Sequence, residues 1–270
     1  MRRFSLIPNA ITAFGLCCGL FVIFKIFLSS GEENLFSFVK SAAILLVIAG
    51  IADMADGAVA RLLKGESEFG GQFDSLSDAV TFGVAPPLLV LRSLPTEAIS
   101  PALQVVLTTS AMVYTLCGVL RLVRYNVTSR ESRLKETFQH KRTYFRGLPI
   151  PAGAALIVSA ALFMISPLFN QWLPLTVQSR AAIMIFVMVL SGYFMVSRWP
   201  FPSVKAFHLK VPSFYLILAV GIFGVLFLYG LLDHFSTGFF LASWLYLLTS
   251  FVFALFKKRS LLEPVEKAEE

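Results

Sequence analysis

Four aspartates lie close together in the sequence, and their flanks are almost wholly apolar. Asp53 and Asp56 are three positions apart, so a helix places both on one face. Asp74 and Asp78 are four positions apart and share a face in the same way. The polar segment between the pairs contains Gly65, a typical helix stop, and predicts two antiparallel helices that bring the pairs together. Four ionised carboxylates in a low-dielectric site repel one another, and two divalent cations would balance their charge.

The elements that must position these aspartates are membrane helices. The chain of 270 residues is 57% hydrophobic and 14% charged, its mean hydropathy is +0.76, and apolar runs of about 20 residues recur along it. The net charge of +7 comes from basic residues in short loops beside helix ends. That distribution favours topology signals and contacts with anionic lipid headgroups, and no nucleic-acid partner is expected. The three cysteines fall inside apolar runs without metal-ligand spacing.

The predicted fold is therefore an all-α polytopic membrane protein with about eight transmembrane helices. We expect the spans at residues 10–29, 36–62, 71–94, 101–125, 150–169, 176–197, 212–232 and 236–256. They form a single integral-membrane catalytic domain over residues 1–256, with a core at 5–200 and two extra C-terminal helices at 212–256. We expect residues 257–270 to form a polar cytoplasmic tail.

The loop charges predict the orientation. All but four of the 23 Lys and Arg residues fall on one side of the arrangement, and the exceptions are Lys25, Lys40, Arg92 and Arg180. The positive-inside rule makes the basic side cytoplasmic. Both termini and the aspartate hinge then face the cytoplasm, which places the active site at the cytoplasmic edge of a bacterial-type inner membrane.

The aspartates belong to a longer pattern, Asp-x2-Asp-Gly-x2-Ala-Arg-x8-Gly-x3-Asp-x3-Asp. It is filled here by Asp53, Asp56, Gly57, Ala60, Arg61, Gly70, Asp74 and Asp78. This pattern resembles the signature of the CDP-alcohol phosphatidyltransferase family. The opening IPNAIT is similar to the short polar segment that leads into that family's first helix. The resemblance covers about residues 5–155 and implies displacement of CMP from a CDP-linked lipid by an alcohol.

The resemblance also implies roles for single residues and a cofactor. Asp53, Asp56 and Asp74 would ligate two divalent cations, Mg²⁺ or Mn²⁺, with Asp78 near the second ion as proton acceptor for the alcohol. The CDP-lipid would be bound by Asn9, Thr12, Gly57, Ala60, Arg61, Ser67 and Gly70. The family further implies a homodimer.

Two later segments point to the acceptor alcohol. RLVRYN carries Arg121, Arg124 and Asn126, and RGLPIPAGA begins with Arg146. Both segments resemble the branch of the family that transfers the phosphatidyl group of CDP-diacylglycerol to L-serine. An arginine fork suits a carboxylate or a phosphate, so these residues could hold serine or contact lipid headgroups. Inositol, inositol phosphate, glycerol phosphate and choline stay open as acceptors, because the signature contacts only the CDP-lipid.

Other interpretations of the four aspartates fit the sequence less well. If they only capped helices or formed local ion pairs, most of their negative charge would remain unbalanced. Intramembrane prenyltransferases hold diphosphate on two Asp-rich motifs that are far apart in sequence, and intramembrane aspartyl proteases need a Gly-x-Gly-Asp run, which GGQFD does not supply. An ion-coupled transporter predicts ionisable residues spread over mid-membrane positions in two repeats.

Overall fold

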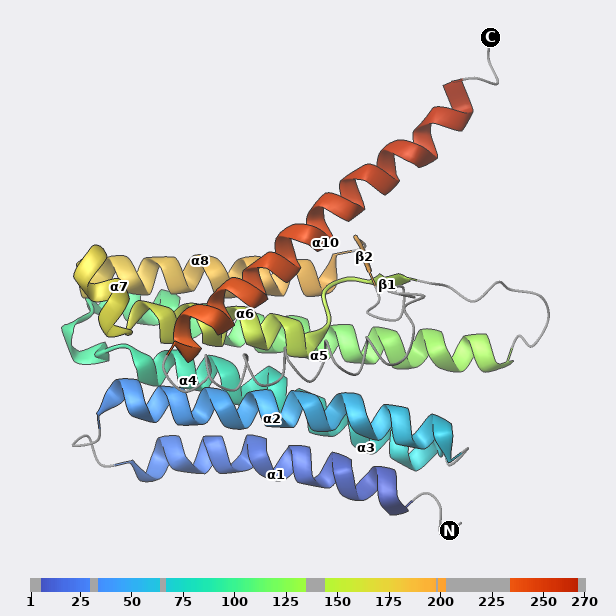
Figure 1. Cartoon of the computed structure of the whole chain (residues 1–270), viewed down its shortest axis with the longest axis horizontal. Coiled ribbons are helices and arrows are strands. Elements are labelled where there is room, and N and C mark those ends of the chain that lie inside the picture. Colours follow the sequence, from blue (N-terminus) through green and yellow to red (C-terminus); the bar gives the residue numbers. More distant parts are fainter. Residues whose placement is uncertain are drawn as a thin grey trace, which may run out of the picture.

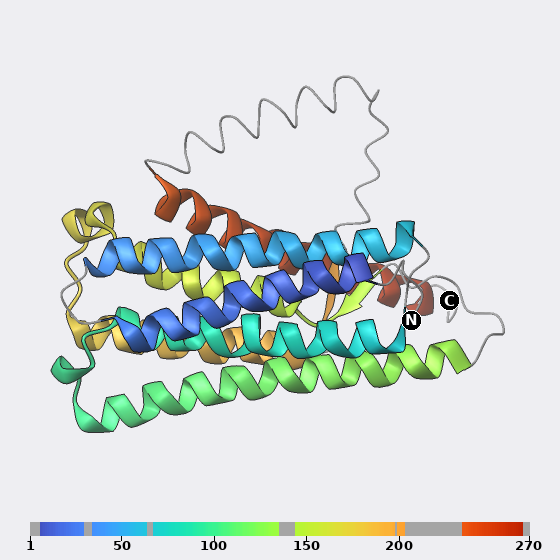
Figure 2. The same ribbon diagram turned by 90° about the horizontal axis from the view of Figure 1, so that it is seen from below.

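The computed structural model describes residues 6–29, 34–63, 67–134, 144–197, 199–202 and 234–266. Long helices run side by side along one axis of the molecule, and the start of α1 lies at the same end as the last turns of α2 (Figures 1 and 2). The helices are α1 (Leu6–Leu28), α2 (Leu35–Leu62), α3 (Glu68–Asp78), α4 (Ala85–Ser93), α5 (Pro101–Leu134), α6 (Ile150–Met164), α7 (Pro167–Trp172), α8 (Val177–Val196) and α10 (Phe235–Glu266).

The predicted helical membrane architecture is confirmed. Within the described ranges, four helices are long and apolar enough to cross a membrane, namely Leu6–Leu28, Leu35–Ala60, Pro101–Thr128 and Val177–Val196. Two shorter apolar helices, Ile150–Met164 and Phe235–Phe251, add to the bundle. The expected span at 212–232 lies outside the described residues, so the total of eight spans stays a prediction. The last helix continues to Glu266, past the expected span end at 256.

The expected span at 71–94 is built from three pieces. Helix α3 passes into a π-helical segment, η2 (Ala79–Val84), which then passes into α4. The cause lies at the start of α4, where Pro86 and Pro87 lack the N–H groups that an α-helix would direct at the carbonyls of Phe82 and Gly83. The wider turn accommodates the proline rings directly after the helix that carries two of the aspartates.

Helix α5 satisfies the two carbonyls that the prolines leave unpaired. The Tyr114 hydroxyl donates to the carbonyl of Phe82 at 3.1 Å, and the Thr115 hydroxyl donates to the carbonyl of Gly83 at 2.9 Å. Tyr114 is fully buried. These two bonds tie α5 to the segment that follows Asp78, because backbone groups in an apolar bundle need internal partners.

Tyr114→Phe should lower the thermal stability of the protein. The substitution leaves the Phe82 carbonyl without a donor, and an unsatisfied buried acceptor costs about 1–3 kcal/mol. Thermal unfolding in detergent measures the effect. Tyr193→Phe on α8 is the matched control because Tyr193 is 60% exposed. Equal unfolding temperatures for the two variants would contradict this account of the π-helical segment.

Small residues let α1 approach its neighbours closely. A Cβ atom added at Gly19 would lie 2.6 Å from Oγ1 of Thr81 in η2, and one added at Gly15 would lie 3.7 Å from the carbonyl of Ala49 in α2. Packing of this kind is typical of membrane helices. It holds α1 against α2, which carries Asp53 and Asp56, and against η2, which directly follows Asp78.

The opposite end of the bundle carries basic side chains. The ammonium of Lys25 lies 4.9 Å from the centre of the Phe38 ring, and the guanidinium of Arg92 lies 5.6 Å from it. Lys25 also donates to the Ser41 hydroxyl at 2.9 Å. Lys25 and Arg92 are two of the four basic residues that fall outside the predicted cytoplasmic side. Cation–π contacts with Phe38 hold both, and Lys25 is also held by the Ser41 hydroxyl.

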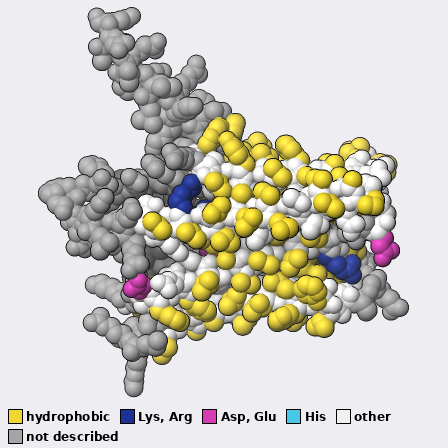
Figure 3. Space-filling model, turned by 180° about the vertical axis from the view of Figure 1, so that it is seen from behind, with side chains coloured by type: hydrophobic (Ala, Val, Ile, Leu, Met, Phe, Trp, Pro, Cys, Tyr) yellow, Lys and Arg dark blue, Asp and Glu magenta, His cyan; other side chains and the backbone are white. Residues whose placement is uncertain are grey.

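The surface is apolar along the bundle. Figure 3 shows hydrophobic side chains over most of the described part of one face, with charged groups in a few places. Phe21, Phe24 and Phe27 on α1 are each more than half exposed, as are Leu116 and Leu120 on α5. Lipid contact accounts for such faces in a chain with this hydropathy.

A short two-stranded ladder is present that the all-α prediction did not include. Strand β1 (Tyr144–Arg146) pairs antiparallel with β2 (Pro200–Pro202), with Arg146 opposite Pro200. Gly147 follows β1 with a φ of +85°, a conformation that favours glycine. A Cβ atom there would also lie 2.5 Å from the carbonyl of Met195, so the tight entry into α6 depends on this glycine. The 3₁₀ turn η3 (Thr96–Ala98) links α4 to α5.

Candidate active site

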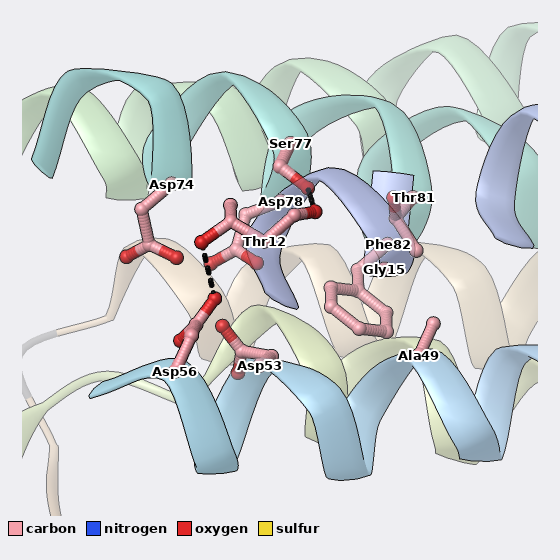
Figure 4. Close-up of a pocket in the computed structure, with 10 residues that line it drawn as sticks. All are labelled: Thr12, Gly15, Ala49, Asp53, Asp56, Asp74, Ser77, Asp78, Thr81 and Phe82. Atoms are coloured by element: carbon pink, nitrogen blue, oxygen red, sulfur yellow. Dashed lines mark hydrogen bonds between the residues drawn. The ribbon is translucent and has the colours of Figure 1, made fainter. Parts of the chain in front are cut away.

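The structure brings carboxylates from two helices together. Oxygen atoms of Asp53, Asp56 and Asp74 all lie within 4.8 Å of one another. Asp78 lines the same small pocket one turn further along α3. Figure 4 shows the side chains from α2 pointing toward those from α3. The expected convergence of the two aspartate pairs is thus present in the structure, with α1 packed against both helices that carry them.

Helix α1 completes the pocket from a third side. The Thr12 hydroxyl donates to Oδ2 of Asp56 at 2.5 Å, as the dashed line in Figure 4 marks. The Ser77 hydroxyl in turn donates to the Thr12 carbonyl at 3.4 Å, which links α1 to α3. Asp56 is only 5% exposed. A charge-assisted bond from a neutral donor therefore fixes the orientation of the most buried carboxylate.

The pocket is strongly negative. The Asp53 and Asp78 carboxyl groups lie within hydrogen-bonding range of each other, and both interact electrostatically with Arg121 on α5. Arg121 contributes one positive charge against four negative ones. Carboxylates this close repel, and their partial burial strengthens the repulsion.

This donor set fits divalent metal ions. Carboxylate oxygens from separate helices are the hard ligands that Mg²⁺ and Mn²⁺ prefer. Three of them converge within 4.8 Å, and the charge deficit around them calls for cations. Asp53, Asp56 and Asp74 are thus suited to hold metal, with Asp78 beside them.

Three residues predicted to contact the CDP-lipid meet at the start of α3, about one helical turn before Asp74. A Cβ atom added at Gly70 would lie 3.0 Å from both Oδ1 of Asn9 and Oγ of Ser67. Ser67 is the N-cap of α3, where its hydroxyl accepts from the Gly70 N–H at 3.0 Å. The structure therefore gives Ser67 a capping bond in addition to any ligand contact. Gly57 and Ala60 lie on α2 beyond Asp56, and the side chain of Arg61 lies outside the described part of the chain.

The four residues predicted for the acceptor have different surroundings. Arg124 donates from one terminal guanidinium nitrogen to the Val196 carbonyl at 2.8 Å and from the other to the Ser197 carbonyl at 3.5 Å, which caps the end of α8. Asn126 and Ser75 on α3 exchange hydrogen bonds at 2.9 and 3.2 Å. For Arg146 the structure describes only the backbone in β1.

Arg121 differs from these residues because one of its hydrogen-bond donors has no partner among the described residues. Its Nε is buried and has no hydrogen-bond partner among the residues that the structure describes, while its charge faces Asp78. A buried unpaired donor is costly, so this nitrogen is suited to an anionic ligand.

Five residues that line the pocket were not predicted from the sequence. They are Gly15, Ala49, Ser77, Thr81 and Phe82. Helical spacing offered a signal, because Gly15 lies three positions after Thr12 and Thr81 lies four after Ser77. Ala49 and Phe82 carry no chemical signal, and only the packing of η2 against α2 brings them to the pocket.

Comparisons with known proteins agree with this geometry. A sequence profile described as CDP-alcohol phosphatidyltransferase matches residues 5–193. A CDP-diacylglycerol–serine O-phosphatidyltransferase of Helicobacter pylori (strain 26695) is 32% identical over 213 residues, which are 79% of this chain and 78% of the relative. A protein of the same name from Bacillus subtilis is 33% identical over 157 residues, 56% of this chain and 73% of the relative.

The mycobacterial relatives are longer. The Mycobacterium bovis protein, also named CDP-diacylglycerol–serine O-phosphatidyltransferase, is 36% identical over 154 residues. The match covers 57% of this chain but only 48% of that relative. The chain thus spans about half the length of the mycobacterial proteins it matches.

Proposed function

The chain belongs to the CDP-alcohol phosphatidyltransferase family, and we propose that it transfers the phosphatidyl group of CDP-diacylglycerol to the hydroxyl of L-serine. The serine oxygen attacks the lipid-side phosphorus, the bond from that phosphorus to the CMP oxygen breaks, and the serine proton passes to a carboxylate. The products are phosphatidylserine and CMP.

One observation carries this proposal. Oxygen atoms of Asp53, Asp56 and Asp74, all members of the family signature, converge from two helices within 4.8 Å. A cluster of acidic groups beside an apolar bundle suits a reaction on a pyrophosphate whose alcohol is anchored in the membrane.

The chain's own residues then have separate tasks. Bound divalent cations would be held by Asp53, Asp56 and Asp74, and would supply charge neutralisation for the pyrophosphate and stabilisation of the leaving phosphate. Thr12 keeps Asp56 oriented through its 2.5 Å hydrogen bond. Asp78, beside Asp53, accepts the proton of the attacking hydroxyl.

The nucleotide end of the substrate would lie against the last turns of α2 and the start of α3. Gly57 lets the CDP moiety approach the α2 backbone closely, because glycine has no side chain. Arg61 would pair with a phosphate of CDP. The side chain of Ala60 is small, so it leaves room for the CDP moiety on the surface of α2 beside Gly57 and Arg61. Asn9, Ser67 and Gly70, which meet at the start of α3, would border the cytidine.

An acceptor panel tests the proposal. Purified protein in detergent with lipid, CDP-diacylglycerol and Mg²⁺ should release CMP and form a new phospholipid with serine. Inositol, inositol phosphate, glycerol phosphate and choline serve as competing acceptors. Faster CMP release with any of these than with serine would reject serine as the acceptor. No CMP release with any acceptor would instead favour the transporter reading.

Arg121→Ala should selectively weaken the use of serine. Arg121 has a buried, unpaired Nε next to Asp78, so we propose that it holds the serine carboxylate. Loss of a charge-assisted hydrogen bond costs about 1.5–3 kcal/mol, which corresponds to about a tenfold to hundredfold higher KM for serine. The KM for CDP-diacylglycerol should change little. Arg121→Lys should restore only part of the loss, because an ammonium cannot form a bidentate fork.

The KM values for serine and CDP-diacylglycerol should also be measured for Arg124→Ala and Arg146→Ala. Arg124 caps α8, so its alanine variant should lower the unfolding temperature more than it changes the ratio of the two KM values. An equal rise of both KM values in Arg121→Ala would assign Arg121 to the lipid phosphate. A serine-specific defect in Arg146→Ala alone would place the carboxylate at Arg146.

The orientation and the oligomeric state are part of the proposal. The aspartate end of the bundle would face the cytoplasm of a bacterial-type inner membrane, where CMP and serine are soluble. Lys25 and Arg92, which flank Phe38 at the far end, would then lie at the opposite surface. A homodimer is expected from the family, and crosslinking in native membranes measures it.

A further inference from the structure

Helix α3 carries Asp74 and Asp78, yet apolar packing does little to fix its rotation about its own axis. The structure describes all of α3, and Ser77 is its only buried residue. Phe69 and Leu76 are each more than half exposed. Rotation of the helix by a fraction of a turn would swing both carboxylates away from those of α2. Polar contacts with neighbouring helices are therefore needed to hold the direction of the carboxylates.

Two serines flank the face of α3 that carries the aspartates. An α-helix turns about 100° per residue, so Asp74 and Asp78 point within about 40° of each other. Ser75 then lies about 80° to one side of their mean direction, and Ser77 lies about 80° to the other side. A bond from each serine to a neighbouring helix would hold the rotation of α3 from both sides.

Both serines make such a bond. The Ser77 hydroxyl donates to the Thr12 carbonyl of α1 at 3.4 Å. On the other side, Nδ2 of Asn126 on α5 donates to the Ser75 hydroxyl at 2.9 Å. The hydrogen of that hydroxyl is within reach of the Gly71 carbonyl at 3.0 Å and of Oδ1 of Asn126 at 3.2 Å. Helix α3 is thus tied to α1 and to α5, and Figure 2 shows it lying between them.

Helix α5 is also attached on the other side of Asp78. The hydroxyls of Tyr114 and Thr115 donate to backbone carbonyls of η2, the segment that directly follows Asp78. The bond from Asn126 reaches α3 before Asp78, because α5 and the α3–η2 segment run in opposite directions. Two attachment points on α5 therefore bracket Asp78, and the bond from Asn126 is the outer one.

We propose that the Asn126–Ser75 bond is a clasp that sets the rotation of α3, with both residues as positioning residues that aim Asp74 and Asp78 into the site. The inference rests on the proposed function and gives Asn126 a role other than direct contact with serine. Its amide nitrogen already has a partner in Ser75, which a substrate group would have to displace. The clasp keeps the carboxylates of α3 close to those of α2 against their mutual repulsion, so the ligands are in place before a cation binds.

Ser75→Ala tests the clasp from the α3 side. Mn²⁺ binding to the purified protein, followed by its paramagnetic resonance signal, should weaken by about threefold to tenfold, the effect of one hydrogen bond. The KM for serine at saturating Mg²⁺ should stay within about twofold of the wild type. Alanine favours the helix, so the variant should fold. Ser75→Thr keeps the hydroxyl and should retain wild-type Mn²⁺ affinity. Gln72→Ala, at an exposed position of α3, is the matched control.

Asn126→Ala tests the clasp from the α5 side. It should weaken Mn²⁺ binding by the same factor as Ser75→Ala. The double variant should lie within about twofold of either single variant, because both substitutions remove one bond. Direct contact between Asn126 and serine gives a different pattern. Asn126→Ala would then raise the KM for serine, Ser75→Ala would leave it unchanged, and the inference would be overturned.

The outcomes separate this inference from the proposed function. A wild type that binds Mn²⁺ and releases CMP, with Ser75→Ala behaving like Gln72→Ala, overturns the inference alone. Additive losses in the double variant overturn it as well. A wild type that releases no CMP and binds Mn²⁺ no better than Asp74→Asn overturns both. Equal and non-additive losses of Mn²⁺ affinity, with the KM for serine unchanged, support the clasp.

Discussion

Asp74→Asn is expected to abolish phosphatidyl transfer. Asp74 is the α3 member of the three-carboxylate cluster, and an amide is a neutral, weaker ligand for a hard cation than a carboxylate. Loss of residues that only orient metal ligands costs about 10–100-fold in metal affinity or activity, so loss of a direct ligand should cost more than about a hundredfold. CMP release from CDP-diacylglycerol in the presence of serine measures the loss, and Asp53→Asn should behave in the same way.

Two further measurements connect the loss to metal. A chelator should stop the wild-type reaction, and added Mg²⁺ or Mn²⁺ should restore it. Binding of Mn²⁺, followed by its paramagnetic resonance signal, should weaken in Asp74→Asn. Glu97→Gln is the matched control, because Glu97 is an exposed carboxylate in the turn before α5. Near-normal turnover by Asp74→Asn, at wild-type metal affinity, would contradict the assignment of Asp74 as a ligand.

Spacing alone was enough to predict the meeting of the aspartates. Helical periodicity places Asp53 with Asp56 and Asp74 with Asp78, and the polar hinge between them requires the helices to turn back on each other. These are local properties of the sequence. The closeness of the carboxylates in the folded protein also depends on α1, which packs against both α2 and α3.

The roles of the arginines could not be separated in that way. Arg121 and Arg124 are three positions apart and look equivalent on a helix. Their difference arises from α8, whose last carbonyls meet Arg124 but not Arg121. A contact between residues more than 70 positions apart depends on how two helices pack, and side-chain type does not encode it.

The break in the expected span at 71–94 has a similar origin. Two consecutive prolines normally indicate the end of a helix. Here the helical column continues, because Tyr114 and Thr115 of α5 supply the donors that the prolines lack. The prolines were visible in the sequence, but their compensation comes from another helix.

Asp78→Asn is expected to lower kcat by about 10²–10⁴-fold, the usual loss when a general base is removed. The hydroxyl of serine is barely ionised at neutral pH, so its proton must be accepted as the oxygen attacks phosphorus. Asp78 lies beside the three-carboxylate cluster and next to Asp53. An amide at position 78 cannot accept that proton. Steady-state kinetics with serine and CDP-diacylglycerol measure the change.

Binding and stability distinguish a lost base from a lost ligand or a damaged fold. The new amide can donate a hydrogen bond to Asp53, and it removes one of the mutually repelling charges. The unfolding temperature of Asp78→Asn should therefore be equal to or above that of the wild type, and CDP-diacylglycerol should bind with nearly unchanged affinity. Because the base acts only in the transition state, the loss should fall on kcat and leave the KM for CDP-diacylglycerol in place. A collapse of CDP-diacylglycerol binding in proportion to turnover would instead make Asp78 a metal ligand and place the base on another residue.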